Sequence, residues 1–119
     1  MSELANLFVW HRQGVLVAGV TGEIDVSNAA SLEREIAGEL DDDAAGLVVD
    51  LAGLEFMDSS GVHLLFGLSR RLAERGLGFA IVMPPESVPR RVLELSGPEP
   101  MDWLHETEEA AVAAALAVT

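Results

Sequence analysis

Two short hydrophobic runs open the chain, and both are rich in residues that favour β-strands. They cover residues 7–12 (LFVWHR) and residues 15–20 (VLVAGV). Only Gln13 and Gly14 separate the runs, and a two-residue link that ends in glycine is typical of a β-hairpin. We therefore predict that the chain begins with two antiparallel strands.

The segment that follows changes to helical spacing. Ser27 or Asn28 can cap a helix, and apolar residues then recur every three or four positions, at Ala29, Leu32, Ile36 and Leu40. This spacing predicts a helix that ends near the acidic residues 41–43. The GEID segment before it, residues 22–25, is interpreted as a glycine turn followed by carboxylates at the start of the helix.

A continuous, branched run at residues 47–51 (LVVDL) is typical of a central strand that is covered on both faces. An apolar stripe from Val62 to Leu72 then predicts a second helix. Its end is marked by arginines and by Gly76, as the helix dipole and C-terminal capping favour. Residues 77–83 (LGFAIVM) form a further predicted strand.

The C-terminal third repeats the alternation. Residues 87–95 predict a third helix, stopped by Ser96-Gly97-Pro98, and residues 101–105 (MDWLH) predict a short edge strand. Thr107 begins an alanine-rich terminal helix. The order β-β-α-β-α-β-α-β-α predicts a single α/β domain over residues 1–119. Its mixed sheet is antiparallel in the first hairpin and mostly parallel afterwards, with about four helices packed on it.

Composition narrows the class of protein. The chain has 119 residues, of which 50% are hydrophobic, and it contains no cysteine, which excludes disulfides and thiolate metal sites. No apolar run reaches the length of a membrane span, and the first residues lack the pattern of a secretory leader. We therefore expect a soluble, cytoplasmic protein.

The charge is strongly acidic. Twenty acidic residues oppose seven arginines, and no lysine is present, so the net charge is −13. Nucleic acid and anionic membranes are expected to be repelled, whereas a basic protein surface would be attracted. The missing lysine also excludes a Walker phosphate loop and Schiff-base chemistry.

Candidate chemistry lies at the junction FMDSSGV, residues 56–62, between the strand run and the second helix. A helix start needs one capping side chain, and Asp58 or a serine can supply it. Capping explains one polar residue but not three in succession. The alternative is that a serine hydroxyl is displayed at the positive end of a helix, beside a carboxylate, where a phosphate on the serine is tolerated.

Other chemistries fit this junction less well. The residue two positions before Ser59 is Met57 rather than glycine, so the nucleophile elbow of a serine hydrolase is incomplete, and only His63 would lie near enough to act as a base. The three histidines are isolated from one another and do not form a metal site by spacing. No cofactor motif is present. A phosphoacceptor role for Asp50, as in receiver domains, lacks the required late lysine.

Four segments together resemble the STAS domain family of anti-sigma factor antagonists. They are VAGVTGEID at residues 17–25, LVVDLAGLEFMDSSGV at residues 47–62, RRLAERG at residues 70–76 and RRVLELSG at residues 90–97. The resemblance covers nearly the whole chain. It implies a STAS-like fold, a β-sheet with helices on one side. His63 stands where a small residue is common in this family.

The resemblance also implies roles for individual residues. A partner anti-sigma factor, which is a serine/threonine kinase with a histidine-kinase-like ATPase fold, would phosphorylate Ser59. A phosphatase would reverse the modification. Asp25 and Asp58 match acidic residues of the partner-facing site. The full set expected to contact the partner is Glu23, Asp25, Asp58, Ser59, Ser60, Gly61 and Val62.

The resulting hypothesis is a non-enzymatic partner switch. The unphosphorylated form would bind the kinase and so release a sigma factor, and phosphorylation of Ser59 would reverse this. Two alternatives remain open: a STAS subunit of a signalling or lipid-transport complex that is never phosphorylated, and a serine hydrolase. Gly61 in the first turn of a helix is costly, and we expect that a closely approaching partner offsets this cost.

Overall fold

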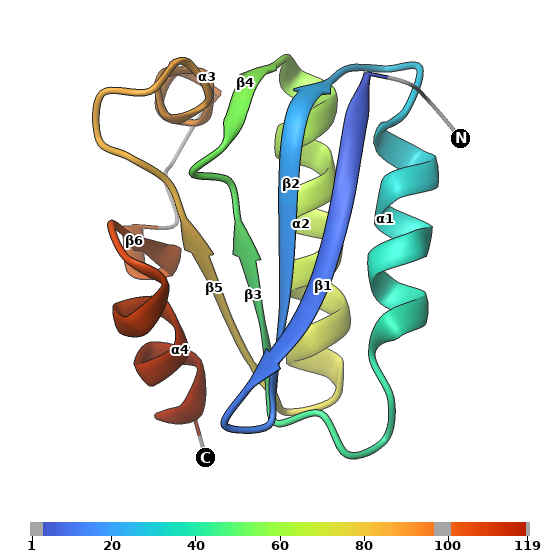
Figure 1. Ribbon diagram of the computed structural model, residues 1–119, viewed down its shortest axis with the longest axis vertical. Coiled ribbons are helices and arrows are strands. Elements are labelled where there is room, and N and C mark those ends of the chain that lie inside the picture. The colour runs from blue at the N-terminus through green and yellow to red at the C-terminus, as the bar shows by residue number, and fades with distance from the viewer. Residues whose placement is uncertain (1–3, 97–100, 119) are drawn as a thin grey trace.

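The computed structural model describes residues 4–96 and 101–118. Within those residues the chain forms a six-stranded sheet flanked by helices (Figure 1). The elements are β1 (Ala5–Arg12), β2 (Val15–Ile24), α1 (Ala29–Glu39), β3 (Gly46–Asp50), β4 (Leu54–Met57), α2 (Ser59–Glu74), β5 (Gly78–Val82), α3 (Val88–Leu95), the 3-10 turn η1 (Met101–Trp103), β6 (Leu104–His105) and α4 (Glu108–Leu116).

The sheet has the strand order β1-β2-β3-β5-β6. The β1–β2 hairpin is antiparallel and the pairs that follow are parallel, which confirms the predicted mixed sheet. The predicted edge strand over residues 101–105 is shorter than expected, because only Leu104 and His105 pair with β5 and a 3-10 turn precedes them. The stop signal Gly97-Pro98 lies outside the described residues.

Strand β4 was not predicted. The hydrophobic run after Gly46 breaks at Asp50, whose carboxylate accepts a hydrogen bond from the Ala52 N–H at 3.0 Å and so closes a turn. The chain then re-enters the sheet as β4. This strand also pairs with β2, but further along it, opposite Gly22 to Ile24. β3 and β4 therefore lie one after the other along the same side of β2.

The expectation that Gly22 ends the second strand was wrong. β2 continues to Ile24, and its register shifts between Gly22 and Glu23, which marks a bulge. Gly22 has φ +92°, a conformation that side chains rarely adopt, and a Cβ there would collide with the Leu4 carbonyl oxygen. Glycine is therefore required by the bulge rather than by a turn.

Helices cover both faces of the sheet (Figure 1). On one face α1 and α2 pack against alternate residues of the strands, including Leu16, Leu47 and Ile81, in the larger core. On the other face α4 packs against the residues in between, such as Val17 and Val48. The implied placement of all helices on one side was therefore wrong for α4, since its alanine-rich sequence does not indicate which face it covers.

The helix starts follow the predicted caps at the C-terminal end of the chain. The Ser87 hydroxyl accepts a hydrogen bond from the Arg90 N–H at 3.2 Å, and the Thr107 hydroxyl accepts one from the Ala110 N–H at 3.1 Å. α4 is also linked to the first strand. Its residue Glu108 accepts hydrogen bonds from Trp10 Nε1 at 3.1 Å and from Arg12 Nη1 at 2.9 Å.

Candidate functional site

The junction between β4 and α2 is capped by Asp58. Its Oδ1 atom accepts a hydrogen bond from the Ser60 N–H at 2.8 Å, and its backbone carbonyl accepts one from the Gly61 N–H at 3.0 Å. The cap is therefore the aspartate, and neither serine side chain is needed for it. Of the two readings of this junction, capping accounts for Asp58 but not for the serines.

Ser59 is the first residue of α2, and it is exposed. Within the part of the chain that the structure describes, no group hydrogen-bonds to its hydroxyl, and neither His63 nor a carboxylate is positioned on it as a base. His63 is exposed on the next turn of the helix. The helix start offers N–H groups and a positive dipole end to an anion attached at this position.

The acidic loop after β2 is held by hydrogen bonds between Asp25 and Ser27. Asp25 Oδ1 accepts hydrogen bonds from the Ser27 hydroxyl at 2.5 Å and from the Ser27 N–H at 2.8 Å. The Ser27 hydroxyl is the main cause, followed by the Ser27 N–H, of a pKa of Asp25 below its usual range. Asp25 therefore carries its negative charge at neutral pH, and neighbouring Glu23 is exposed beside it.

The buried side chain of Asn28 is hydrogen-bonded to the backbone of this loop at two points. Its side chain is 4% exposed, its Oδ1 accepts from the Asp25 N–H, and its Nδ2 donates to the Glu23 carbonyl, both at 2.9 Å. The sequence predicts Ser27 or Asn28 as the cap of this helix. Asn28 occupies the N-cap position of α1, but its side chain makes no capping bond and turns back to the loop. The sequence does not reveal this role, because an asparagine before a helix looks the same whether its side chain caps the helix or bonds to the preceding loop.

The structure brings the acidic loop and the serine junction together. β2 and β4 run parallel, with Glu23 paired to Phe56 and Ile24 paired to Met57. The Asp58 N–H then donates to the Ile24 carbonyl at 3.2 Å. Asp25 and Asp58 therefore follow directly from two neighbouring strand ends at the same edge of the sheet, near the starts of α1 and α2 (Figure 1).

A groove of about 200 Å³ lies between the first turns of α1 and α2. Val26, Ser60 and His63 contribute to its lining. Val26 is 82% exposed, and Phe56 on β4 is 42% exposed, so two apolar side chains accompany the acidic ones at this end of the sheet. Neither was predicted as a site residue, because a single apolar residue in a sequence does not reveal its exposure.

Two residues expected at the partner surface are instead internal. Val62 is 3% exposed and belongs to the core between the helices and the sheet. Gly61 is buried as well, and a Cβ on it would lie 2.8 Å from Met57 Sδ and 2.9 Å from Met57 Cβ. Close packing on Met57 therefore requires glycine at this position and offsets its cost to the helix.

The described residues contain no group of three or more histidine, cysteine, aspartate or glutamate side chains that could hold a metal ion. Among the same residues, no helix is both long and apolar enough to cross a membrane.

The chain belongs to the STAS domain family, whose signature matches residues 9–111. The anti-sigma-F factor antagonist RsfB of Mycobacterium tuberculosis is 37% identical over 84 residues, which cover 71% of this chain and 67% of RsfB. The structure of an anti-sigma factor antagonist from Mycobacterium paratuberculosis superposes with a TM-score of 0.78 at 32% identity, and 93% of each chain is covered.

The Bacillus protein SpoIIAA is a further structural relative. Its unphosphorylated form superposes with a TM-score of 0.70 at 25% identity, covering 90% of this chain and 93% of SpoIIAA. The structure of its phosphorylated form superposes with a TM-score of 0.65 at 26% identity, covering 91% of this chain and 97% of that one.

The packing of Gly61 gives a stability prediction. We expect Gly61→Ala to lower the free energy of unfolding by about 1 to 3 kcal/mol, since the new methyl group overpacks against Met57. Gly38→Ala in α1 is the matched control, because nothing lies within 4 Å of a Cβ at that position. It should instead stabilise by about 0.5 to 1 kcal/mol. Urea denaturation of both variants provides the measurement, and equal stabilisation by the two would contradict the packing role.

The loop hydrogen bonds give a pH prediction. Ser27→Ala should raise the pKa of Asp25 toward its ordinary value, because the strongest donor to the carboxylate is lost. Since the folded pKa of Asp25 is depressed, its contribution to stability is present at neutral pH and lost as the pH falls through that pKa. Carboxyl NMR titration measures the change. Ser31→Ala, which removes a hydroxyl with no part in these bonds, should leave the Asp25 titration unaltered.

Proposed function

We propose that this protein is an anti-sigma factor antagonist that works by partner switching on Ser59. In its unphosphorylated form it binds an anti-sigma factor that is also a serine kinase with a histidine-kinase-like ATPase fold, and the sigma factor is released. The kinase phosphorylates Ser59 and the complex separates, until a phosphatase removes the phosphate. The observation that carries the proposal is an exposed serine on the first turn of a helix that its neighbour Asp58 caps. Among residues 4–96 and 101–118, no group hydrogen-bonds to the hydroxyl of this serine.

The relatives support the same class of function. RsfB and the Mycobacterium paratuberculosis protein are both named as anti-sigma factor antagonists. SpoIIAA carries that name too, and it exists in an unphosphorylated and a phosphorylated form. The present chain shares their fold over most of its length, which favours the same mode of action.

The surface around Ser59 suits a basic partner with an apolar centre. Glu23, Asp25 and Asp58 supply negative charge, while Val26 and Phe56 supply apolar area. The net charge of −13 steers positively charged surfaces toward the molecule. A kinase docked at this end of the sheet would cover Ser59. The Ser59 hydroxyl could then accept the phosphoryl group.

Electrostatics gives the direction of the switch. A phosphoserine adds about −1.5 to −2 charges. Each pair of like unit charges about 6 Å apart costs about 2 to 3 kcal/mol at an effective dielectric constant near 20. The dipole of α2 returns only about 0.3 to 1 kcal/mol. Phosphorylation therefore opposes binding where a carboxylate of the docked partner faces Ser59, because that repulsion is absent in the free protein. The fold itself, whose helix start favours an anion, is retained.

The direct test is phosphoryl transfer. The protein is incubated with ATP and the kinase encoded in the same cell, and the phosphorylated residue is located by mass spectrometry. Phosphate on Ser59, accompanied by loss of the complex, is the expected result. A stable complex without phosphate transfer would contradict the switch and would indicate a constitutive STAS binding subunit. Reaction of Ser59 with a fluorophosphonate probe would indicate a hydrolase.

The first functional prediction concerns Ser59→Ala. We expect this variant to fold, to bind the kinase and to stay bound in the presence of ATP, because the acceptor hydroxyl is absent. Ser60→Ala is the matched control, since its hydroxyl is adjacent and only its backbone N–H serves the cap. It should still be released by ATP. Size-exclusion chromatography of the complexes with and without ATP gives the readout, and equal release of both variants would exclude Ser59 as the switch.

The second functional prediction concerns Ser59→Asp, which brings one negative charge where phosphate brings nearly two. It should weaken kinase binding by tens-fold to about a hundred-fold, and the phosphorylated protein should bind more weakly still. Ser59→Asn, which has a similar shape but no charge, should bind much more tightly than Ser59→Asp. Titration calorimetry measures all four proteins.

Salt provides the internal check on this electrostatic account. The difference between Ser59→Asp and Ser59→Asn should shrink when the Debye length falls from about 10 Å at 0.1 M to about 3 Å at 1 M salt. A difference that does not change with salt would mean that shape rather than charge separates the complex.

A further inference from the structure

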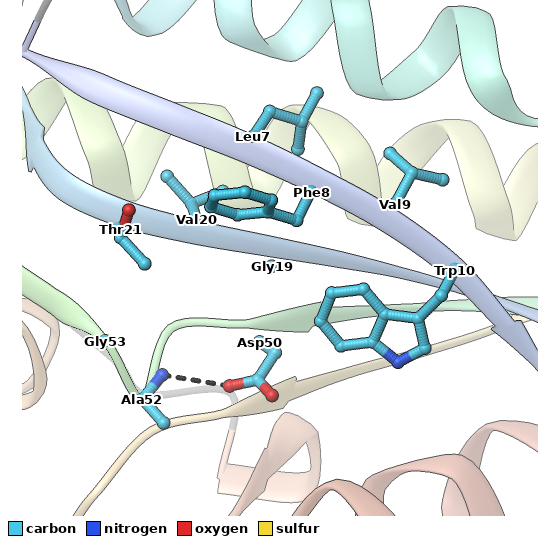
Figure 2. A pocket seen from close by; sticks show the side chains of 10 residues that line it. All are labelled: Leu7, Phe8, Val9, Trp10, Gly19, Val20, Thr21, Asp50, Ala52 and Gly53. Carbon is cyan, nitrogen blue, oxygen red and sulfur yellow. Dashed lines mark hydrogen bonds between the residues drawn. The ribbon is translucent and has the colours of Figure 1, made fainter.

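A second surface lies on the face of the sheet that carries α4. The helix covers β3 and β5 there but leaves much of β1 and β2 open, and a groove of about 750 Å³ occupies the uncovered area (Figure 2). Phe8 and Trp10 from β1, Gly19 and Thr21 from β2, and Asp50 and Gly53 line it. The groove shares no lining residue with the groove beside Ser59.

Two aromatic side chains form its wall. Phe8 is 54% exposed and Trp10 is 37% exposed, whereas Gly19 and Val17, the residues of β2 that pair with them, are buried. The Trp10 ring lies over β2, where a Cβ on Gly19 would come within 2.7 Å of Trp10 Cη2. Glycine at this position therefore lets the indole lie against the sheet, and the open space between the ring and Asp50 is preserved (Figure 2).

The floor of the groove carries a carboxylate without a cation. Asp50 is partly buried, and one of its oxygens is held by the Ala52 N–H. Burial is the main cause of a raised pKa of Asp50, and the nearby Glu108 raises it further. Arg12, the cation of this face, is paired with Glu108 at 2.9 Å. Among the described residues no arginine or histidine forms an ion pair with Asp50.

We propose that this groove binds the guanidinium group of an arginine on a partner protein, with Asp50 as its counter-ion and with Phe8 and Trp10 as its aromatic contacts. Guanidinium is planar and weakly hydrated, so it stacks on aromatic rings and binds carboxylates with paired hydrogen bonds. Phosphate and other anions are disfavoured, because Asp50 lines the groove with Glu108 nearby and no arginine or histidine is among the lining residues.

The position of the groove favours a side chain from another protein over a free metabolite. Phe8 and Trp10 are on β1, which is one of the two edge strands in the described sheet, so a neighbouring chain can reach the groove from the side. The acidic net charge favours approach of a basic segment. Because Ser59 does not line the groove, binding of arginine there does not require the proposed switch.

The test uses NMR titration of the full-length labelled protein with N-acetylarginine N-methylamide. We expect shifts at the Trp10 indole N–H and at the amides of Gly19 and Ala52. The citrulline analogue, which has the same shape without the charge, should produce none. Free L-arginine carries in addition an α-ammonium and an α-carboxylate, which a side chain within a protein lacks, and it should bind no more tightly than the blocked derivative. Tighter binding of free arginine would indicate a metabolite site and overturn the assignment to a protein side chain.

Variants separate this site from general charge effects. Asp50→Asn should weaken binding of the blocked arginine about tenfold or more, as expected when the ionic partner of a hydrogen-bonded charge is removed. Asp42→Asn removes the same charge from an exposed loop and should leave binding unaltered. Phe8→Leu, an exposed and conservative change, should also weaken it. Ser59→Ala should have no effect, so failure here is distinct from failure of the switch.

Three results would overturn the proposal: binding that does not distinguish arginine from citrulline, equal behaviour of Asp50→Asn and Asp42→Asn, or no shift at Trp10. A fourth is self-association. If sedimentation shows a dimer in which Trp10 is shielded from quenching by iodide, the occupant of the groove is a second copy of the chain rather than an arginine of a partner.

Discussion

The break between Asp50 and Leu54 determines where both surfaces of this molecule lie. β2 has ten residues and β3 has five, so β3 alone cannot pair with the whole of β2. The turn at Asp50 lets the chain return beside β2 as β4. At the end of β4, the chain places Ser59 next to the acidic loop. At the end of β3, it leaves the Asp50 carboxylate on the face of the sheet that carries the second groove.

The hydrophobic pattern was sufficient to predict most of the elements but not this break. Leu51, Leu54 and Met57 are all apolar and all buried, so a strand that stops and restarts has the same pattern as one that continues. Asp50 and Gly53, both residue types common in turns, were the local signals. Similarly, α4 was predicted as a helix from Thr107 and the alanines that follow. Its placement on the far face depends on the small residues Gly46 and Gly78, which let it approach the sheet closely.

The sequence predicted which polar residues make up the candidate site, but not which of its residues are exposed. Asp58, Ser59 and the acidic loop stand out because several polar residues interrupt apolar runs. Exposure is different, since it depends on partners that are distant in sequence. Gly61 and Val62 belong to the same motif but face Met57 and the core, while Val26 and Phe56 are exposed next to the motif. Asn28 is buried and bonded to the loop, which an isolated asparagine in a sequence cannot reveal.

The link between Glu108 and β1 has a consequence for folding kinetics. It joins residues 96 and 98 positions apart, and α4 packs on strands that are themselves joined by parallel, non-local pairing. A nine-residue helix is too short to be stable alone in water. α4 therefore acquires its structure only after β2, β3 and β5 are assembled, and docking of this helix is a late event in folding. Its amides should report local opening in hydrogen exchange, independently of α1 and α2 on the other face.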